Sequence, residues 1–156
     1  MTQHGFYIVK DSFFDLANDP HLENNKGENR PFYLCFAETN EKTKLLWMIP
    51  VSSRIEKYQG IIDQKAMMHK PIDGLYICEI RGRRKEAFLI QDMFPITANY
   101  IEREYSHNGS HFLLTREKGI VAIEAKANKV LRLLKKGIRL TPTSSDVERI
   151  IAHLNS

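Results

Sequence analysis

The segment VSSRIEKY, residues 51–58, carries two neighbouring hydroxyls and a lysine that could together hold a phosphate. Ser53 and Glu56 have the S-x-x-E spacing of a capping box, which predicts a helix start. The free N–H groups of a helix N-terminus suit phosphate oxygens. Lys57 follows Ser53 by about one helical turn and can reach the same end. Two interpretations stay open: the serines only cap a helix, or the capped end, with Ser52 and Lys57, also binds a phosphate.

A polar loop at 24–31 contributes the side chains of Asn25, Lys26 and Arg30. The loop precedes the apolar stretch FYLCFAET, which the turn NEKT joins to KLLWMIPV, and this pattern is typical of a β-hairpin. Such a hairpin places Arg30 at the same open end as the two serines, although the segments are far apart in sequence. The alternative for the loop is an ordinary solvated connection. The hairpin therefore predicts that hydroxyls and cations from two distant segments become neighbours.

The histidines offer one candidate for proton transfer. His69, beside Lys70 in a predicted loop, could serve as a general base or acid, although most loop histidines are simply exposed. His107 and His111 have i, i+4 spacing, but the Asn-Gly between them favours a turn over a helical metal pair. The sequence contains no H-E-x-x-H, P-loop or dinucleotide-binding glycine pattern. We therefore expect neither a metal ion nor an organic cofactor.

Basic residues are concentrated in two stretches, although the net charge is only +4. In the first, residues 116–139, two acidic residues stand among the basic Arg116, Lys118, Lys126, Lys129, Arg132, Lys135, Lys136 and Arg139. The second stretch, RGRRK, consists of Gly82 with Arg81, Arg83, Arg84 and Lys85. A local excess of this kind suits a polyanionic partner. The alternative is a solvated charged face.

The elements that must position these residues follow from hydrophobic spacing. Residues 6–9 form an apolar strand, followed by a short helix that ends near Asn18. The stretch 75–96 predicts a second hairpin, and 97–105 a brief helical or irregular segment. The segment EKGIVAIEAKANKVLRLLKKG has apolar residues three and four positions apart, so it predicts an amphipathic helix that Gly137 closes. A final helix follows SSDVERIIAHL. Because the strands come as hairpins, we expect an α+β fold, a twisted antiparallel β-sheet core flanked by helices.

Length and composition fit one domain over residues 1–156. Hydrophobic residues make up 42% and charged residues 27%, as in an ordinary globular protein. The apolar runs are too short to span a bilayer, and the N-terminal segment lacks the pattern of a signal peptide, so we expect a cytoplasmic protein. Cys35 and Cys78 lie in apolar strands and are expected to be buried thiols.

Taken in order, several stretches resemble the toxins of type III toxin–antitoxin systems, the ToxN/AbiQ group and especially its CptN/TenpN branch. They are FYIVKDSFF, NKGENRPFYLCF, WMIPVSSRIEKY, GLYICEIRGRRKEAFLIQDMFPI and the basic C-terminal helix. The resemblance implies a metal-independent endoribonuclease on a sheet similar to those of the MazF/Kid/CcdB toxins. It also implies inhibition by a repeat RNA folded as a pseudoknot, which the toxin processes, within a closed ring of toxin and RNA. The implied role is abortive phage infection or plasmid maintenance.

The resemblance also implies roles for individual residues. The hydroxyl-then-lysine segment of the family falls on Ser52, Ser53 and Lys57, where ToxN relatives have Thr-Ser-Pro-Lys and their lysine two positions earlier. The basic residue before the second strand falls on Arg30, and the neighbouring loop residues on Lys26 and Asn25. The implied cleavage uses the ribose 2′-OH and leaves 2′,3′-cyclic phosphate and 5′-OH ends. Lys57 and Arg30 would stabilise the phosphorane, the serines would orient it, and Lys26 or His69 would transfer protons.

The same resemblance assigns RNA binding to the basic stretches. The helix at 116–139 and RGRRK are expected to bind the antitoxin backbone, through Arg81, Arg83, Arg84, Lys126, Lys129, Arg132 and Lys136. Substrate bases would dock unstacked in the groove, near Asn25 and His69. Two alternatives fit the basic patches equally well: a non-catalytic RNA- or DNA-binding module, and a MazF-like toxin with a protein antitoxin. Tandem nucleotide repeats upstream of the gene would favour the RNA antitoxin, and an upstream reading frame the protein one.

Overall fold

The computed structural model describes residues 1–23, 30–39, 42–81, 84–142 and 144–156. Within these residues, seven antiparallel strands form one sheet in the order β4-β5-β3-β2-β1-β7, with β6 paired to β3 beside this path. The strands are β1 Phe6–Val9, β2 Phe32–Thr39, β3 Lys44–Ser52, β4 Tyr76–Arg81, β5 Arg84–Phe88, β6 Phe94–Ile96 and β7 Ile101–Glu104. A separate ribbon consists of β8 Ser106–His107 and β9 Ser110–His111.

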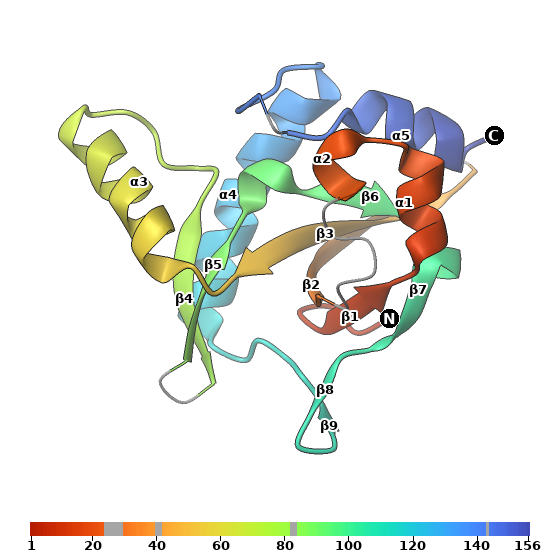
Figure 1. The fold of residues 1–156 in the computed structure, drawn as a ribbon, viewed down its shortest axis with the longest axis horizontal. Coiled ribbons are helices and arrows are strands. Elements are labelled where there is room, and N and C mark those ends of the chain that lie inside the picture. The colour runs from red at the N-terminus through yellow and green to blue at the C-terminus, as the bar shows by residue number, and fades with distance from the viewer. Residues whose placement is uncertain (24–29, 40–41, 82–83, 143) are drawn as a thin grey trace.

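Helices cover this sheet, so the expected α+β architecture is confirmed (Figure 1). The helices are α1 Asp11–Ala17, α2 Pro20–Glu23, α3 Ile55–Met67, α4 Glu117–Lys135 and α5 Val147–Leu154, with short 3-10 turns at η1 Ile90–Asp92 and η2 Ala98–Tyr100. In Figure 1, α4 passes behind the strands, while α1, α2 and α5 gather at the opposite end of the view from α3. No helix of the described residues is both long and apolar enough to cross a bilayer.

The two central strands bury both of their faces, which explains why they are continuous apolar runs in the sequence. Along β3, Trp47 and Ile49 belong to the core that packs against α4. The intervening Leu46 and Met48 belong to the second core, which includes side chains of α1, α2 and α5. Side chains of a strand alternate between its two faces, so a strand inside both cores has apolar residues at every position.

The amphipathic helix expected in the C-terminal third is α4. Its buried residues are Gly119, Ile123, Ala127, Val130, Leu131 and Leu134. The helix closes as predicted at Gly137, whose φ of 76° lies in the left-handed region. The amides of Gly137 and Ile138 donate to the carbonyls of Leu134 and Leu133, which is the Schellman pattern. The opposite face of α4 is therefore free to carry basic side chains.

α3 projects from the body of the protein next to the β4–β5 hairpin (Figure 1). None of its residues, all of which the structure describes, is buried, and Met67 near its end is 82% exposed. The helix follows β3 after only two residues, Ser53 and Arg54. The start of α3 is therefore tied to the end of β3, whereas its far end extends away from the sheet.

The segment 97–105 differs from its prediction as a helical or irregular stretch. Ala98–Tyr100 forms the 3-10 turn η2, but β7 then pairs with β1, with Tyr7 opposite Glu104. β7 has the sequence IERE, and three of its four side chains are exposed. Charged residues are common on a sheet edge because they discourage pairing with another chain. Such a strand lacks the apolar alternation by which buried strands are identified.

Gly119 in α4 has no room for a side chain, because an ideal Cβ there would lie 2.6 Å from the Cys78 Sγ. We expect Gly119→Ala to lower the free energy of unfolding by about 1–3 kcal/mol, since overpacking outweighs the gain in helix propensity. Urea unfolding measures the change. Gly60→Ala in α3 is the control: nothing lies within 4 Å of a Cβ there, so it should be neutral or stabilising.

Combining Gly119→Ala with Cys78→Ala tests the cause of this loss. The second substitution removes the sulfur that the new methyl group meets, so the double variant should be more stable than the sum of the single changes predicts. Strict additivity of the two changes would contradict a clash at this point.

Candidate active site

The register of the β2–β3 hairpin brings the two predicted segments together. Phe32 pairs with Pro50, so Arg30 and Ser52 each lie two residues beyond this pair, at the same open end. Arg30, Ser52 and Ser53 line one pocket of about 220 Å³. Ser52 is half-buried, whereas Arg30 and Ser53 are exposed. The predicted convergence of Arg30 with the two serines is therefore present in the structure.

β3 extends further than its apolar residues indicate, which changes the local role of the serines. Ser52 pairs with Ala87 of β5, so the strand continues to Ser52 and α3 begins only at Ile55. The N-cap residue is Arg54, without a side-chain cap hydrogen bond, so the expected Ser53–Glu56 capping box is wrong. The Ser52 Oγ instead accepts a hydrogen bond of 3.2 Å from the Arg54 amide.

The second wall of this pocket comes from the β4–β5 hairpin, with Ile80, Arg84 and Glu86. Both the Nε and the Nη2 of Arg84 lie 2.9 Å from the Glu86 Oε1. The Arg84 guanidinium carbon also lies 6.0 Å from the centroid of the Phe112 ring. Arg84 was expected to bind antitoxin RNA, but it shares a pocket with Arg30, Ser52 and Ser53. We name this pocket, with its aromatic side chains Phe6, Tyr105 and Phe112, the aromatic pocket.

A second pocket, of about 240 Å³, adjoins the aromatic pocket. The two share Arg30, Val51, Ser52 and Arg54 as lining residues. The second pocket adds Tyr58 of α3 and Asp92 of η1, and we name it the Asp92 pocket. The end of β3 and Arg30 therefore lie between two hollows, an arrangement in which a phosphate could have a nucleotide on each side.

Asp92 is the most perturbed acid of the site. Burial raises the pKa of its carboxyl to about 6, and the nearby Lys57 ammonium opposes this rise. Its Oδ1 is buried and has no hydrogen-bond partner among the described residues. Burial also raises the pKa of Tyr58, as does Asp92, while Arg54 and Arg30 act in the opposite direction. Ionisable groups from three segments are thus coupled at this pocket.

Lys57 lies beside this cluster and does not line either pocket. With Ser53 and Arg54 it borders a shallow hollow at the start of α3. Its Nζ lies 5.2 Å from the centroid of the Tyr58 ring. The one-turn spacing therefore places Lys57 next to Ser53, as expected, and its charge acts on Asp92.

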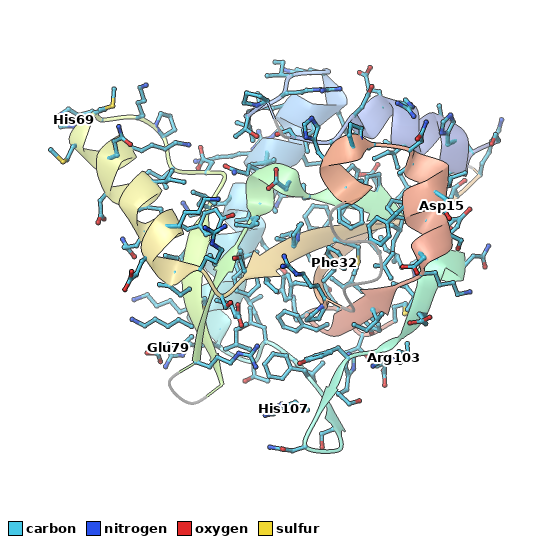
Figure 2. All side chains as sticks on the ribbon, in the orientation of Figure 1. Asp15, Phe32, His69, Glu79, Arg103 and His107 are labelled. Atoms are coloured by element: carbon cyan, nitrogen blue, oxygen red, sulfur yellow. The ribbon has the colours of Figure 1, made fainter. Side chains whose placement is uncertain are left out.

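The structure separates His69 from this site. α3 is 13 residues long, which corresponds to about 20 Å, and His69 follows its far end. Figure 2 shows His69 at the tip of this projecting element. A shared role with Ser52 and Ser53 in proton transfer is not compatible with this position. His107 lies in the β8–β9 ribbon, whose tight turn has positive φ at Asn108 and Gly109, as the Asn-Gly sequence predicts.

The remaining predicted residues fall into two groups. Asn25, Lys26 and Arg83 lie outside the described residues, and Arg81 ends β4. On α4, Lys126 donates to the carbonyl of Ile72, and Lys129 lies 3.6 Å from Asp73. Arg132 and Lys136 are exposed on α4 and at its C-terminal cap. Arg132 and Lys136 therefore present exposed charges on the predicted RNA-binding helix.

Arg54, Tyr58, Glu86 and Asp92 belong to the site but were not predicted. Glu86 offered a signal, because it is a charged residue next to the apolar run AFLI at the end of a hairpin. Asp92 lies between two apolar stretches, and no spacing rule relates it to Tyr58. No group of three or more His, Cys, Asp or Glu side chains within the described ranges could hold a metal ion.

The site as a whole can bind and polarise a phosphodiester. Arg30, Arg54 and Arg84 supply guanidinium groups around two serine hydroxyls, and Lys57 adds an ammonium beside them. Guanidinium groups hold phosphate oxygens in pairs, and fixed cations stabilise charge that develops on those oxygens.

Comparison with protein-family models and with curated proteins yields no match. Among solved structures, the fold is similar to that of AbiQ, with a TM-score of 0.68 and 15% sequence identity. The similarity covers 97% of this chain and 95% of that chain. AbiQ is described as a lactococcal anti-phage endoribonuclease belonging to the type III toxin–antitoxin system. The chain therefore shares, over nearly its whole length, the α+β fold of a type III toxin.

Proposed function

We propose that this protein is an endoribonuclease toxin of a type III toxin–antitoxin system, with residues 1–156 acting as one domain in the cytoplasm. The observation that carries the proposal is the meeting of Arg30, Ser52 and Ser53 at one pocket. Two segments distant in sequence bring hydroxyls and cations to a point between two hollows, on a fold shared with AbiQ. Within that family, we assign the protein to the CptN/TenpN branch, on the resemblance of its ordered stretches.

In the proposed reaction the ribose 2′-OH attacks the adjacent phosphorus, and the bond to the leaving 5′-oxygen breaks. The products are a 2′,3′-cyclic phosphate and a 5′-OH. Arg30 and Lys57 stabilise the crowded phosphorane oxygens, while Ser52 and Ser53 orient the phosphate. Lys26, four residues before Arg30 in the sequence, transfers the protons. This reaction needs neither a metal ion nor a cofactor.

The products of the reaction provide its test. Purified protein is incubated with single-stranded RNA in the presence of EDTA, and the ends of the fragments are analysed. We expect cleavage in EDTA, fragments with 5′-OH groups that polynucleotide kinase labels directly, and 2′,3′-cyclic phosphates on the other side. A requirement for Mg²⁺, or 5′-phosphate ends, would contradict the proposed mechanism.

The proposed partner is a small repeat RNA, folded as a pseudoknot, which the toxin cuts from a longer precursor and binds in a closed ring. The exposed Arg132 of α4 and Lys136 at its C-terminal cap, with Lys129 and Lys126 on the same helix, supply a basic face for the RNA backbone. Such binding weakens steeply as the salt concentration rises.

The main alternative is a non-catalytic nucleic-acid-binding module, which the basic residues alone would equally permit. The pocket between Arg30 and the serines favours catalysis, because a binding surface does not require hydroxyls enclosed among cations. RNA that copurifies with the protein decides between the candidates when it is sequenced. Repeats encoded upstream of the gene indicate the antitoxin, whereas an upstream reading frame would favour a MazF-like toxin with a protein antitoxin.

A further inference from the structure

Glu86 is a carboxylate enclosed in the wall of the aromatic pocket. The residue is only 4% exposed, although β5 lies near the edge of the sheet. Both contacts from Arg84 fall on the Oε1 atom. The hydrogen bond that Arg84 donates involves only Oε1, and the Oε2 atom, unlike the Asp92 Oδ1, is not a fully buried atom without a partner. Oε2 is therefore an acceptor that a ligand in the pocket can reach.

An Arg–Glu pair in this position is not needed for stability as such. Replacing a buried ion pair by apolar residues of similar size is often neutral or stabilising. The Arg84 side chain is 52% exposed, so solvent weakens its attraction to the carboxylate. Folding stability therefore does not explain why this pair lies in a pocket that also contains Ser52 and Ser53.

The pocket offers both contacts that an unstacked nucleobase uses. Tyr105 is half-buried and supplies aromatic surface on which a base can pack, next to the buried rings of Phe6 and Phe112, and such packing tolerates any base. When the carboxylate is ionised, Glu86 Oε2 can accept a hydrogen bond but cannot donate one. The Arg84 guanidinium, in contrast, can donate but cannot accept. A base with an amino group next to a ring acceptor fits this pair. Adenine, cytosine and guanine have such an amino group, and uracil has none.

We infer that the aromatic pocket holds the base of a nucleotide adjoining the scissile phosphate, and that Glu86 accepts a hydrogen bond from the exocyclic amino group of that base. Glu86 is then a specificity-determining residue, and one side of the cut carries adenine, cytosine or guanine rather than uracil. This inference rests on the proposed function for the position of the phosphate, because Ser52 and Arg30 line the same pocket.

The test removes single amino groups from the RNA. A substrate with a mapped cut is remade with an amino-free analogue on either side of the cut: inosine for guanosine, purine riboside for adenosine, or 2-pyrimidinone riboside for cytidine. On one side, the analogue should reduce kcat/KM of the wild-type protein about 10- to 100-fold, the range for losing a hydrogen bond to a charged group. Equal cleavage of all analogues would overturn the inference.

Substitution of Glu86 links the effect to this carboxylate. Glu86→Ala should cleave the parent RNA and the analogue at similar rates, and Glu86→Gln, which keeps an acceptor, should fall between. Glu79→Gln is the matched control: Glu79 lies on the neighbouring strand of the same hairpin, pairs with Arg116 at 3.2 Å, and should retain the wild-type preference (Figure 2). If Glu86→Ala keeps the full preference, the carboxylate does not read the base. Glu86→Gln serves this comparison should the alanine variant not fold.

Binding separates this inference from the proposed function. The same pairs of RNA are prepared with a 2′-O-methyl group at the cut, which blocks attack by the 2′-OH, and their Kd values are compared. Absence of cleavage together with weaker binding of the amino-free RNA would reject the nuclease but retain the base pocket. Cleavage without any discrimination would retain the nuclease and reject the pocket. Absence of both cleavage and binding would reject both.

Discussion

Arg30→Ala is expected to reduce RNA cleavage by about 10²- to 10³-fold, the effect of removing one group that stabilises transition-state charge. Arg30 lines both pockets and lies at the open end of the β2–β3 hairpin, opposite Ser52. Single-turnover cleavage of a mapped RNA measures the loss, and expression of the variant without antitoxin should no longer arrest growth. Arg30→Lys should recover only part of the activity, because an ammonium cannot hold two phosphate oxygens as a guanidinium does.

Arg103→Ala is the matched control for Arg30. Arg103 is an exposed arginine of β7, at the other end of the strand order from β5, and Figure 2 shows it far from α3. Its variant should cleave RNA at the wild-type rate. Ser53→Ala and Lys57→Ala extend the test to the second segment. If Arg30→Ala stays within about threefold of the wild type, or if the Ser53 and Lys57 variants both remain toxic, the active site lies elsewhere.

The second large effect concerns stability. Asp92→Asn should raise the free energy of unfolding at pH 8 by about 3 kcal/mol, because the pKa of this carboxyl rises from 3.8 to about 6 on folding. Above pH 6 the folded protein contains an ionised carboxylate whose Oδ1 lacks a partner among the described residues. Asparagine has nearly the same shape and no charge, so it removes this penalty.

The pH dependence has a definite direction. An acid whose pKa is higher in the folded state favours the protonated form there, so Asp92 lowers stability at high pH. As pH falls from above 6 to below 4, this penalty disappears. The difference in free energy of unfolding between Asp92→Asn and the wild type should therefore be largest at pH 8 and shrink towards pH 4. The titration of other groups contributes equally to both proteins, so it cancels in this difference.

Urea unfolding of both proteins at several pH values measures this difference. Asp63→Asn on the exposed face of α3 is the control, and its effect should stay within about 0.5 kcal/mol at every pH. In a Lys57→Met background, Asp92→Asn should raise the free energy of unfolding by more than it does in the wild type. The reason is that the Lys57 ammonium opposes the rise in the pKa of Asp92. A difference that does not change between pH 4 and pH 8 would show that burial does not perturb this carboxyl.

A stabilising substitution in a functional pocket is physically reasonable. Charged groups at binding and catalytic sites often destabilise the fold. Replacing them therefore raises stability and lowers activity. Asp92 lines a pocket with Arg30 and Ser52, and its charge acts with that of Lys57 near the proposed phosphate. The charge of Asp92 therefore belongs to the electrostatic balance of the site.

The secondary structure of the central sheet could be predicted from the sequence because its strands are buried and short turns join them. The hairpin at 32–52, the first strand and helix, and α4 with its Gly137 cap all follow from apolar spacing and turn residues. The second hairpin was predicted over 75–96, but it ends at Phe88, and Phe94–Ile96 forms the separate strand β6, which pairs with β3. β7 could not be predicted, because an exposed edge strand has charged residues where a buried strand has apolar ones. The start of α3 was misplaced, since strand pairing at Ser52 overrides a capping signal at Ser53.

The sequence by itself determined that Arg30 and the serines would share one end of a hairpin, because antiparallel register depends on strand length and turn length. Only the tertiary structure decided what surrounds them. Pairing of β5 with the end of β3 brings Arg84 and Glu86 to the serines, and η1 brings Asp92 to Tyr58. These contacts join segments that are more than twenty residues apart, so they depend on which strands pair and on how the helices pack. The spacing of residues along the chain determines neither strand pairing nor helix packing. Both are determined when the two faces of the sheet are buried.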